Sequence, residues 1–346
     1  MKTPTVELDG SFGEGGGQIL RSSLALSLLT GRPFRLRNIR ARRSKPGLQP
    51  QHLKSVHAAA EVGRAHVKGA QLGSVVLDFE PGPVQPGKYH FRIGTAGATS
   101  LVLHTVYLPL ALAGAASTVT IEGGTHVPHS PCFHFLEHTW RAYLALLGAP
   151  IRLTMERAGF YPRGGGVIHA AIEPVKTLHG SPLAGAAASP VSHARVLSAV
   201  AGLPDHIVTR QAQRAMERLG GRGLEIEVCA EHWPGGPGTM LGIELDTQPA
   251  PTFFFAIGER GKRAETVADE AVAQAEAFLD TGPAGIDEHS ADQVVLPLAF
   301  AAESSSFAAA RASQHLLTNI AVIQQFVDRR IECEGSDGTP GSVRIE

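Results

Sequence analysis

A glycine-rich loop near the start of the chain has the composition of an anion-binding turn. Residues 9–21 read DGSFGEGGGQILR, in which Gly13 and Gly15–Gly17 surround one acidic residue, Glu14. Glycines let backbone N–H groups approach an anion closely, and the start of a following helix favours negative charge. Glu14 is a candidate ligand for Mg²⁺, which prefers one or two carboxylates together with phosphate oxygens. The alternative is a tight turn that leaves Glu14 in solvent.

A histidine near the other end of the chain is a candidate nucleophile. His315 follows a Ser-Gln pair and opens the helical pattern HLLTNIAVIQQF. A neutral imidazole attacks phosphorus, and the resulting phosphoramidate is a good donor once the ring is protonated. The alternative is a structural histidine at the start of a helix.

Positive charge is concentrated in one early stretch. Residues 15–60 contain nine Lys or Arg and no Asp or Glu, and most of the nine fall within 32–45. Such clustering is typical of phosphate binding, although a solvated basic face has the same composition. The whole chain has 31 Lys or Arg and 32 Asp or Glu, a net charge of −1. That balance excludes binding to polyanions by overall charge, so any such binding must come from a local patch.

Several common chemistries lack their signature. The chain has no GxxxxGK[ST] and no GxSxG, and Gln18 stands where a dinucleotide-binding fingerprint needs a spaced glycine. A segment rich in metal-binding residue types contains His126, His129, Cys132, His134 and His138. A zinc site is one interpretation of this segment, but the spacings match no structural zinc pattern.

Composition predicts a folded protein of a reducing compartment. Apolar residues make up 43% of the 346, which is enough for a core. Cys132, Cys229 and Cys333 are odd in number and far apart, which argues against a disulfide framework. No apolar run reaches the roughly 18 residues of a membrane span, and the N-terminus lacks the apolar stretch of a signal peptide. We therefore expect a cytoplasmic protein.

Three similar segments must position these residues. The segments 13–31, 94–114 and 287–302 each pass from a small or polar loop into an apolar stretch that predicts a buried helix. Each is followed by a strand-like piece and a second helical pattern, at 52–63, 133–148 and 315–326. Alternating strands, including GKYHFRIG in the first unit and GSVRIE in the last, close the units. The sequence therefore predicts a repeat of two helices and a small sheet.

The spacing of the repeats predicts an inserted domain. The first two loops begin 81 positions apart, whereas the LPLAL and LPLAF patterns of the second and third units are 188 apart. We place a small domain at 183–282, entered through the Gly/Ala/Ser/Pro-rich stretch 179–193. It should contain a strand, a turn and a helix, followed by the strand LEIEVCAEH. Residues 1–182 and 283–346 then form the repeat domain, in units of about 1–92, 93–182 and 283–346.

Six motifs in order resemble the RNA 3′-terminal phosphate cyclase family, from about Leu8 to Glu346. They are DGSFGEGGGQILR, IRARRSKPGLQPQHL, IGTAGATSLVL, GFYPRGGG, HSADQVVLPLA and HLLTNIAV. The resemblance implies an α+β fold of three repeats, each of two helices and a four-stranded sheet similar to the C-terminal domain of translation initiation factor 3. It also implies a smaller α/β insert.

The resemblance also implies an activity. Enzymes of this family are AMP-forming ligases that convert an RNA 3′-phosphate to a 2′,3′-cyclic phosphate, using ATP and Mg²⁺ or Mn²⁺. A histidine first accepts AMP, the RNA 3′-phosphate then accepts it from the histidine, and the 2′-hydroxyl finally displaces it. The implied partners are RNA 3′-phosphate ends, with no membrane and no obligatory protein partner.

The family's functional positions map onto this sequence through the same motifs. His315 matches the nucleophile and Glu14 the metal-binding carboxylate. The positions that contact phosphates and the RNA terminus match Arg21, Arg40, Arg43, Gln51 and His52. The nucleotide-binding positions match His104, Pro131, His289, Ser290, Ala291, Asp292 and Gln293. Asp292 is expected to lie near His315 and to orient its ring.

Two departures bear on the choice of nucleotide. The family pattern has Tyr near position 289 and Gln at 104, where this chain has His289 and His104. Histidine stacks and hydrogen-bonds too, so ATP remains the expected nucleotide. The stretch GGTHVPHSP also departs from the family pattern at His126 and Val127, whereas Pro131 matches it.

Three other functions are alternatives, and particular residues distinguish each of them from a cyclase. A non-catalytic cyclase-like protein of ribosome assembly would lack the nucleophile, and His315 is present in its motif. An enolpyruvyl transferase, built from similar repeats, would need a different set of site residues. A nucleotide-independent RNA chaperone would suit the basic stretch but would leave Glu14 unexplained.

Overall fold

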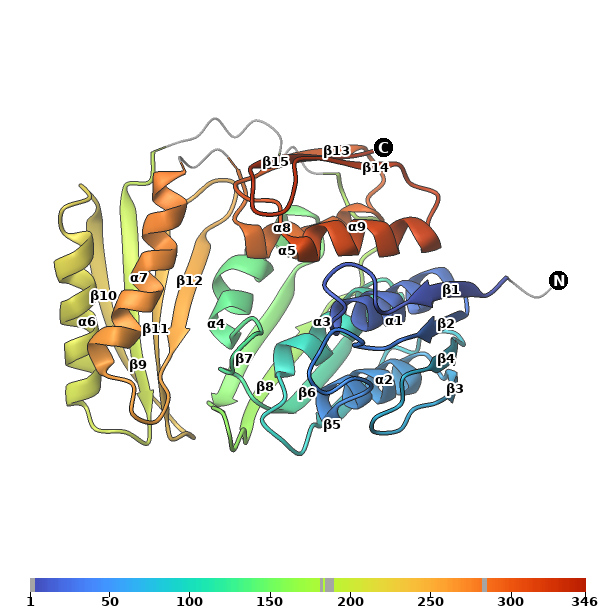
Figure 1. Ribbon diagram of the computed structural model, residues 1–346, viewed down its shortest axis with the longest axis horizontal. Helices are drawn as coiled ribbons and strands as arrows, with labels where there is room; N and C mark the ends of the chain where they lie inside the picture. Colours follow the sequence, from blue (N-terminus) through green and yellow to red (C-terminus); the bar gives the residue numbers. More distant parts are fainter. Residues whose placement is uncertain (1–3, 181–182, 184–189, 282–284) are drawn as a thin grey trace.

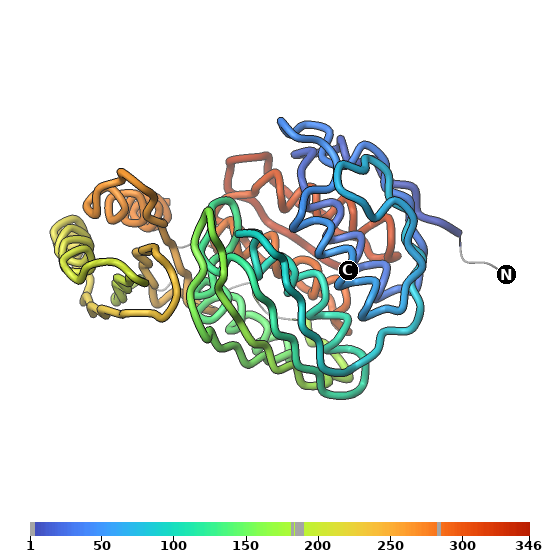
Figure 2. The backbone as a smooth tube through the Cα atoms, turned by 90° about the horizontal axis from the view of Figure 1, so that it is seen from below, coloured from blue at the N-terminus to red at the C-terminus, as the bar shows by residue number. Residues whose placement is uncertain are grey.

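The computed structural model describes residues 4–180, 183, 190–281 and 285–346. It shows a mixed α+β protein, with the insert projecting as a separate lobe from the body formed by the rest of the chain (Figures 1 and 2). None of the helices described is both long and apolar enough to cross a bilayer.

The first unit combines a four-stranded sheet with two helices. Its elements are β1 (Val6–Asp9), α1 (Gln18–Thr30), β2 (Phe34–Arg37), α2 (Pro50–Val62), β3 (His66–Lys68) and β4 (Leu77–Glu80). The strand order is β1-β2-β4-β3, with β1 and β2 parallel and the other pairs antiparallel. A parallel pair needs a crossover connection, and α1 supplies it.

The second unit has a sheet of the same order. Its elements are β5 (Lys88–Arg92), α3 (Thr99–Ala111), β6 (Ser117–Gly123), α4 (Phe133–Phe135), the π-helical turn η1 (Leu136–Trp140), α5 (Arg141–Leu146), β7 (Ile151–Arg157) and β8 (Gly166–Ile172). The order β5-β6-β8-β7 again pairs the first two strands in parallel. The expectation that the strand in GKYHFRIG closes the first unit is therefore wrong. Alternation identifies a strand but not its partner, and the crossover through α3 places β5 beside β6.

The last unit has one strand fewer than expected. It comprises α8 (Glu288–Leu298), β13 (Ser305–Ala309), α9 (Gln314–Phe326), β14 (Ile331–Glu334) and β15 (Gly341–Ile345). Within the described residues its sheet has three strands, in the order β13-β15-β14. A single parallel bridge between Ile286 and Ala309 stands where the other sheets have a first strand. A Cβ on Gly285 would lie 2.4 Å from the Ala308 carbonyl oxygen, which shows how closely the two segments approach there.

The insert has its own sheet and core. Its elements are β9 (His193–Ala201), α6 (His206–Leu219), β10 (Glu225–Trp233), β11 (Gly238–Leu245), β12 (Thr252–Ile257) and α7 (Ala264–Asp280). The expected strand, helix and strand at its start are confirmed. The sheet order β10-β9-β11-β12 differs from that of the other units, and α6 and α7 pack together over the sheet (Figure 1). The expected boundaries at 182–183 and 282–283 involve residues outside the described part of the chain.

Helices from different units meet in the middle of the body. Helix α1 packs against α9, α3 and α2, and α8 packs against α9. Nine of the thirteen residues of α1 are buried, and Gly31 ends the helix in the left-handed conformation at φ 69°. Burial on several sides explains why the apolar pattern of α1 is nearly continuous. The N-terminal ends of α1 and α9, which bear Glu14 and His315, are thereby brought together.

Candidate active site

The glycine-rich loop between β1 and α1 fits tightly between two helices. A Cβ on Gly13 would lie 2.2 Å from Thr318 Oγ1 on α9, and one on Gly17 would lie 2.4 Å from His52 Nε2 on α2. Gly13 also has a φ of 57°, a conformation that favours glycine. Glycine is therefore required here both for close approach and for the backbone turn.

Glu14 lies where this loop, an arginine and the predicted nucleophile meet. Its side chain is only 12% exposed, and its Oε2 lies 2.8 Å from Arg43 Nη2 and 3.4 Å from His315 Nε2. Arg42 holds the loop by donating from Nη1 to the Gly13 carbonyl oxygen at 2.8 Å. Arg43 and His315, which are 272 positions apart in the sequence, thus share one carboxylate.

Further cationic and imidazole groups surround the loop. Burial lowers the pKa of Arg21 to about 10, with the charges of Glu14 and Asp292 opposing the shift, so the guanidinium stays charged at neutral pH. Arg40 donates from Nη1 to the carbonyl oxygens of its own loop. Burial, helped by nearby arginines, lowers the pKa of His52 to about 3, so this ring is neutral.

His315 occupies the first turn of α9. Ser313 caps the helix by accepting a hydrogen bond from the Leu316 amide at 3.1 Å. Burial lowers the pKa of His315, Glu14 opposes the shift, and Arg21 favours it. The ring is therefore neutral at pH 7, with a lone pair available for attack. Its Nε2 faces Glu14, whereas its buried Nδ1 has no hydrogen-bond partner in the described chain.

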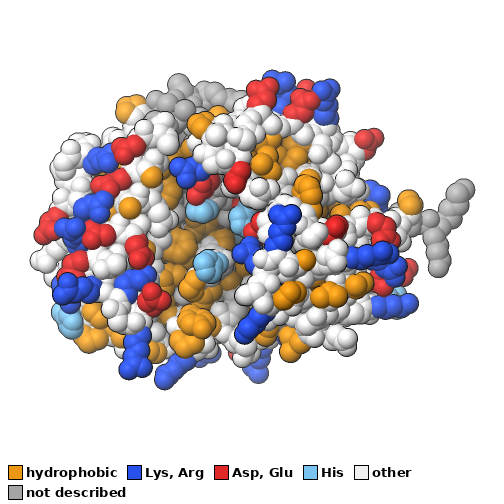
Figure 3. All heavy atoms as spheres, in the orientation of Figure 1, with side chains coloured by type: hydrophobic (Ala, Val, Ile, Leu, Met, Phe, Trp, Pro, Cys, Tyr) orange, Lys and Arg blue, Asp and Glu red, His pale blue; other side chains and the backbone are white. Residues whose placement is uncertain are grey.

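A pocket opens beside α1. Its lining residues come from α1, α3, η1, α5, α8 and α9: Gln18, Arg21, Ser22, Ala25, His104, Tyr107, Leu108, Trp140, Leu144, Asp292, Gln293, Leu296, Pro297 and Asn319. Figure 3 shows histidine side chains near the centre of one face, at a hollow bordered by hydrophobic side chains between the insert and the body.

Several buried polar atoms at this place have no hydrogen-bond partner among the described residues. They include His104 Nε2 and Gln293 Oε1 in the pocket, and Ser290 Oγ and His315 Nδ1 beside it. The His104 ring packs on Trp140 at a centroid distance of 4.6 Å, and burial lowers its pKa to about 3. Buried polar groups are nearly always hydrogen-bonded in native proteins, so a cluster of unsatisfied ones marks a place where a polar ligand fits.

The structure gathers part of the predicted set into the pocket. Arg21, His104, Asp292 and Gln293 line it. Pro131 is absent from the lining, and its carbonyl oxygen accepts a hydrogen bond from Ser100 Oγ at 2.7 Å.

Other predicted residues are not part of the pocket lining. Gln51 Oε1 accepts a hydrogen bond from the Ala98 amide at 3.3 Å. Ala291 is fully buried in α8. His289 is exposed, with its Nε2 3.7 Å from a Glu288 oxygen.

Asp292 is placed differently from expectation. No hydrogen bond joins it to His315, whose ring faces Glu14 instead. Burial raises the pKa of Asp292 well above its usual range, Asp287 adds to the shift, and Arg21 opposes it. The carboxyl group lines the pocket together with Arg21.

Sequence reasoning missed the residue that ties the helices together. Asn319 Oδ1 accepts hydrogen bonds from Gln18 Nε2 at 3.0 Å and Ser22 Oγ at 2.5 Å, and its Nδ2 donates to the Asp292 carbonyl oxygen at 2.8 Å. Gln18 Oε1 in turn accepts from Arg21 Nη2 at 2.9 Å. The available signal was spacing, because Asn319 lies one helical turn after His315 on the same face of α9.

The histidine-rich segment is a structural cluster. His126 Nε2 lies 2.9 Å from His134 Nδ1, and the His134 ring stacks on Trp233 of the insert at 4.5 Å. His138 Nδ1 lies 2.7 Å from Glu244 Oε2 on β11. Because the buried rings of His126 and His134 form a hydrogen bond with each other, these nitrogen atoms are not free to bind zinc. Across the described ranges no three His, Cys, Asp or Glu side chains are arranged to hold a metal ion.

The residues around Glu14 fit a divalent cation that is coordinated by this carboxylate and by oxygens of a bound ligand. One carboxylate cannot hold Mg²⁺ alone, but carboxylate and phosphate oxygens together suit it. The arginines and the loop amides suit phosphate, and the neutral His315 ring suits attack on phosphorus. The fold and site thus define a protein built for chemistry on a phosphate-bearing ligand.

Comparison with known proteins gives this class a family. A family model described as RNA 3′-terminal phosphate cyclase matches residues 12–333. Curated relatives bear the same name. The protein of Ectopseudomonas mendocina is 43% identical over 333 residues, covering 96% of each chain. That of Salmonella typhimurium is 42% identical over 332 residues, again covering 96% of each. That of Pseudomonas fluorescens is 45% identical over 334 residues, covering 96% of this chain and 95% of the relative. The chain therefore belongs to the RNA 3′-terminal phosphate cyclase family.

Proposed function

We propose that this protein is an ATP-dependent, AMP-forming RNA 3′-terminal phosphate cyclase in which His315 carries the AMP. The observation that supports the proposal best is the contact of Glu14, in a glycine-rich loop, with both Arg43 and His315. His315 is neutral and lies in the first turn of a capped helix. The shared name of the relatives supports the reaction class.

The first step forms a bond between nitrogen and phosphorus. His315 Nε2 attacks the α-phosphorus of ATP, the P–N bond forms, and the bond to the β-phosphate oxygen breaks to release pyrophosphate. Nε2 is assigned because it faces Glu14 and the loop, whereas Nδ1 is buried. The ring keeps its proton on Nδ1 during this attack and therefore becomes cationic. A cationic imidazole is a good leaving group in the next step.

The RNA reacts in the second and third steps. A 3′-phosphate oxygen attacks the phosphorus of the histidine-bound AMP, which gives a phosphoanhydride and frees neutral His315. The adjacent 2′-hydroxyl then attacks the RNA phosphorus and gives up its proton to solvent, and the anhydride P–O bond breaks so that AMP leaves with the electron pair. This last step is intramolecular, so the protein contributes mainly alignment and charge stabilisation.

The site residues divide into three groups in this proposal. Glu14 would hold Mg²⁺ or Mn²⁺, which neutralises phosphate charge when bound. The phosphate and RNA-terminus contacts are Arg21, Arg40, Arg43, Gln51 and His52. The nucleotide contacts are His104, Pro131, His289, Ser290, Ala291, Asp292 and Gln293. The atoms His104 Nε2 and Gln293 Oε1, which have no hydrogen-bond partner among the described residues, support the nucleotide contacts, because a base edge would satisfy both.

We also propose that the three units are repeats of one fold, similar to the C-terminal domain of translation initiation factor 3. Identical strand order and strand directions in the first two sheets support this. The bridge at Ile286 supports a reduced first strand in the third unit.

The proposed function is tested by its covalent intermediate. Incubated with Mg²⁺ and ATP labelled at the α-phosphate, the protein should acquire label that is labile to acid and stable to alkali, as a P–N bond is. RNA ending in a 3′-phosphate should then discharge the label and become cyclised. Cyclisation without any labelled protein would contradict the proposal.

A further inference from the structure

The loop between β7 and β8 presents an aromatic and a basic side chain to solvent. We call residues 158–165 the Tyr161 loop. The Tyr161 side chain is 70% exposed, more than any other large hydrophobic residue in the described chain, and Arg163 two positions on is also exposed. The loop contains most of the motif GFYPRGGG, to which the proposed reaction assigns no role.

The loop is firmly anchored beneath Tyr161. Phe160 is buried, and a Cβ on Gly238 of the insert would lie 2.1 Å from its ring. The Gly164 amide donates to the Phe160 carbonyl oxygen at 2.7 Å, and Arg157 Nε donates to the Gly165 carbonyl oxygen at 2.9 Å. The backbone around Tyr161 is thus fixed and Phe160 points inward, so little backbone conformational entropy is lost when the exposed Tyr161 ring meets a ligand.

Contacts connect this loop to the RNA side of the proposed site. A Cβ on Gly164 would lie 2.8 Å from the Thr95 carbonyl oxygen, so the loop rests on the segment before α3. That segment in turn rests on Gln51, through the Ala98 amide at 3.3 Å and a Gly97 position whose Cβ would lie 2.8 Å from Gln51 Cβ. Two contacts therefore separate the Tyr161 loop from a residue proposed to meet the RNA terminus.

The loop also borders the segment that carries Pro131. The amides of Thr125 and His126 donate to the Gly159 carbonyl oxygen at 2.9 and 3.0 Å, and Thr125 Oγ1 accepts from the Gly159 amide at 2.9 Å. On its other side, Ala158 bridges to Gly235 of the insert. The Tyr161 loop thus lies where the second unit and the insert meet, next to the segment that leads to Pro131.

We propose that Tyr161 and Arg163 form a subsite for single-stranded RNA upstream of the reacting terminus. The Tyr161 ring stacks on a base, and the Arg163 guanidinium pairs with a backbone phosphate. Stacking tolerates every base, because each has a π-face, and arginine recognises phosphate without regard to sequence. This inference rests on the proposed function, because it assumes an RNA strand whose 3′ end lies near Gln51.

The subsite predicts that strand length matters. A dinucleotide with a 3′-phosphate contains the reacting group but has no upstream nucleotide to stack, whereas a strand of about ten nucleotides does. Tyr161→Ala should raise the KM for the long strand about tenfold and leave the KM for the dinucleotide unchanged. Tyr161→Phe, which keeps the ring, should behave like the unmodified protein.

Arg163 is tested by salt. Arg163→Ala should raise the Kd for the long strand and reduce the slope of log Kd against log salt concentration by about 0.7, the value for one phosphate contact on a single strand. Arg152→Ala is the matched control, because Arg152 is exposed at the opposite end of β7. It should change neither quantity.

The outcomes separate this inference from the proposed function. Labelling of the protein by ATP alone needs no RNA, so it should be equal in all four variants. Normal labelling with a Tyr161→Ala protein whose KM is unchanged for both substrates would overturn the subsite and leave the proposed function standing. An equal rise in KM for dinucleotide and long strand would also overturn it. Absence of labelling in the unmodified protein would instead refute the proposed function.

Discussion

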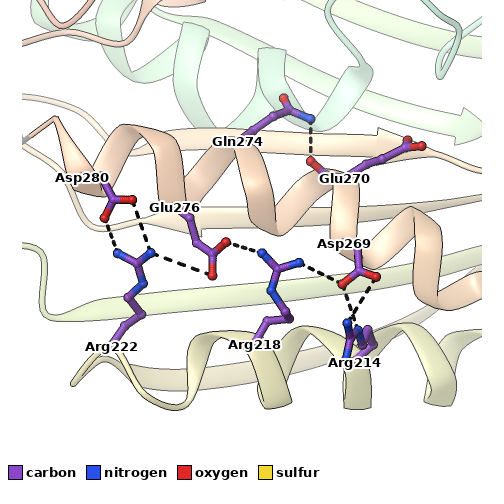
Figure 4. A network of polar contacts seen from close by, with 8 residues as sticks. All are labelled: Arg214, Arg218, Arg222, Asp269, Glu270, Gln274, Glu276 and Asp280. Atoms are coloured by element: carbon purple, nitrogen blue, oxygen red, sulfur yellow. Dashed lines mark hydrogen bonds and ion pairs between the residues drawn. The ribbon is translucent and has the colours of Figure 1, made fainter.

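The α6–α7 pair of the insert and the surroundings of His315 differ in how completely their charged and polar groups are paired. In the insert, a row of arginines on α6 and in the turn just after it faces a row of carboxylates on α7 (Figure 4). Arg214 and Arg218 lie 2.8 and 2.9 Å from Asp269, and Arg222 lies 2.5 Å from Asp280. Each of these cations faces a carboxylate within the protein itself.

The surroundings of His315 are incompletely paired. Glu14 contacts both Arg43 and His315. Within the part of the chain that the structure describes, buried nitrogen or oxygen atoms of His104, Gln293 and His315 have no hydrogen-bond partner. Both regions join two helices from distant parts of the chain. The difference indicates that the α6–α7 row stabilises the fold, whereas the polar groups near His315 are arranged for a ligand that completes them.

The largest expected effect comes from removing the shared carboxylate. Glu14→Gln should slow transfer of AMP to the protein by a factor of about a hundred or more, because it removes the proposed cation ligand and a charge beside His315. Single-turnover labelling with ATP measures this. Glu7→Gln, at an exposed carboxylate on β1, is the control and should be silent. Equal rates in the two variants would break the contrast between the regions.

The residue that joins α1, α8 and α9 should affect both rate and stability. Asn319→Ala leaves the donors of Gln18 and Ser22 without an acceptor, which should cost about 2 kcal/mol of unfolding free energy. It also frees the Gln18–Arg21 pair, so we expect a loss of labelling rate of about tenfold. Denaturant unfolding and single-turnover labelling measure the two effects. Gln325→Ala, exposed on the same helix, should change neither.

Acid should distinguish the α6–α7 row from the buried histidine cluster that contains His126. Burial lowers the pKa of His126 from 6.5 to about 3. Between these values the unfolded chain binds a proton that the folded ring does not, so unfolding free energy should fall as pH drops below about 6.5. The loss from this residue should reach about 2 kcal/mol by pH 5. Asp269 stays charged there, since hydrogen bonds from Arg214 and Arg218 lower its pKa against the effect of burial.

Substitution tests the origin of this pH dependence. His126→Gln should reduce the slope of unfolding free energy against pH in the range 5 to 6.5. His66→Gln, at an exposed histidine on β3, should leave the slope unchanged. An identical slope in both variants would remove His126 as the source.

The smallest effect is expected in the ion-pair row. Arg218→Gln loses contacts with Asp269 and Glu276, but both partners are reachable by solvent and keep other arginines. We expect a loss of about 1 kcal/mol or less in unfolding free energy, reduced further by salt, and no change in labelling rate. A loss as large as that of Asn319→Ala would show that the row matters more to stability than exposure implies.

Local pattern was enough to predict most elements but not all their partners. The buried helices at α1, α3 and α8 follow from continuous apolar stretches, and the insert follows from the spacing of the repeats. The placement of β5 in the second sheet could not be read from alternation, which is the same in either sheet. The motifs nominated Glu14 and His315, but only the fold shows that Glu14 and not Asp292 faces the imidazole. Asn319 was missed because it joins three helices, and a local sequence pattern does not show which distant helices come into contact.

The most direct test of the account is the position of the adenylate. The protein should be treated with ATP and Mg²⁺, digested under alkaline conditions and analysed by mass spectrometry. The account predicts one AMP on the peptide that contains His315, and none in His315→Ala. AMP on any other residue, or cyclisation of RNA by His315→Ala, would contradict it.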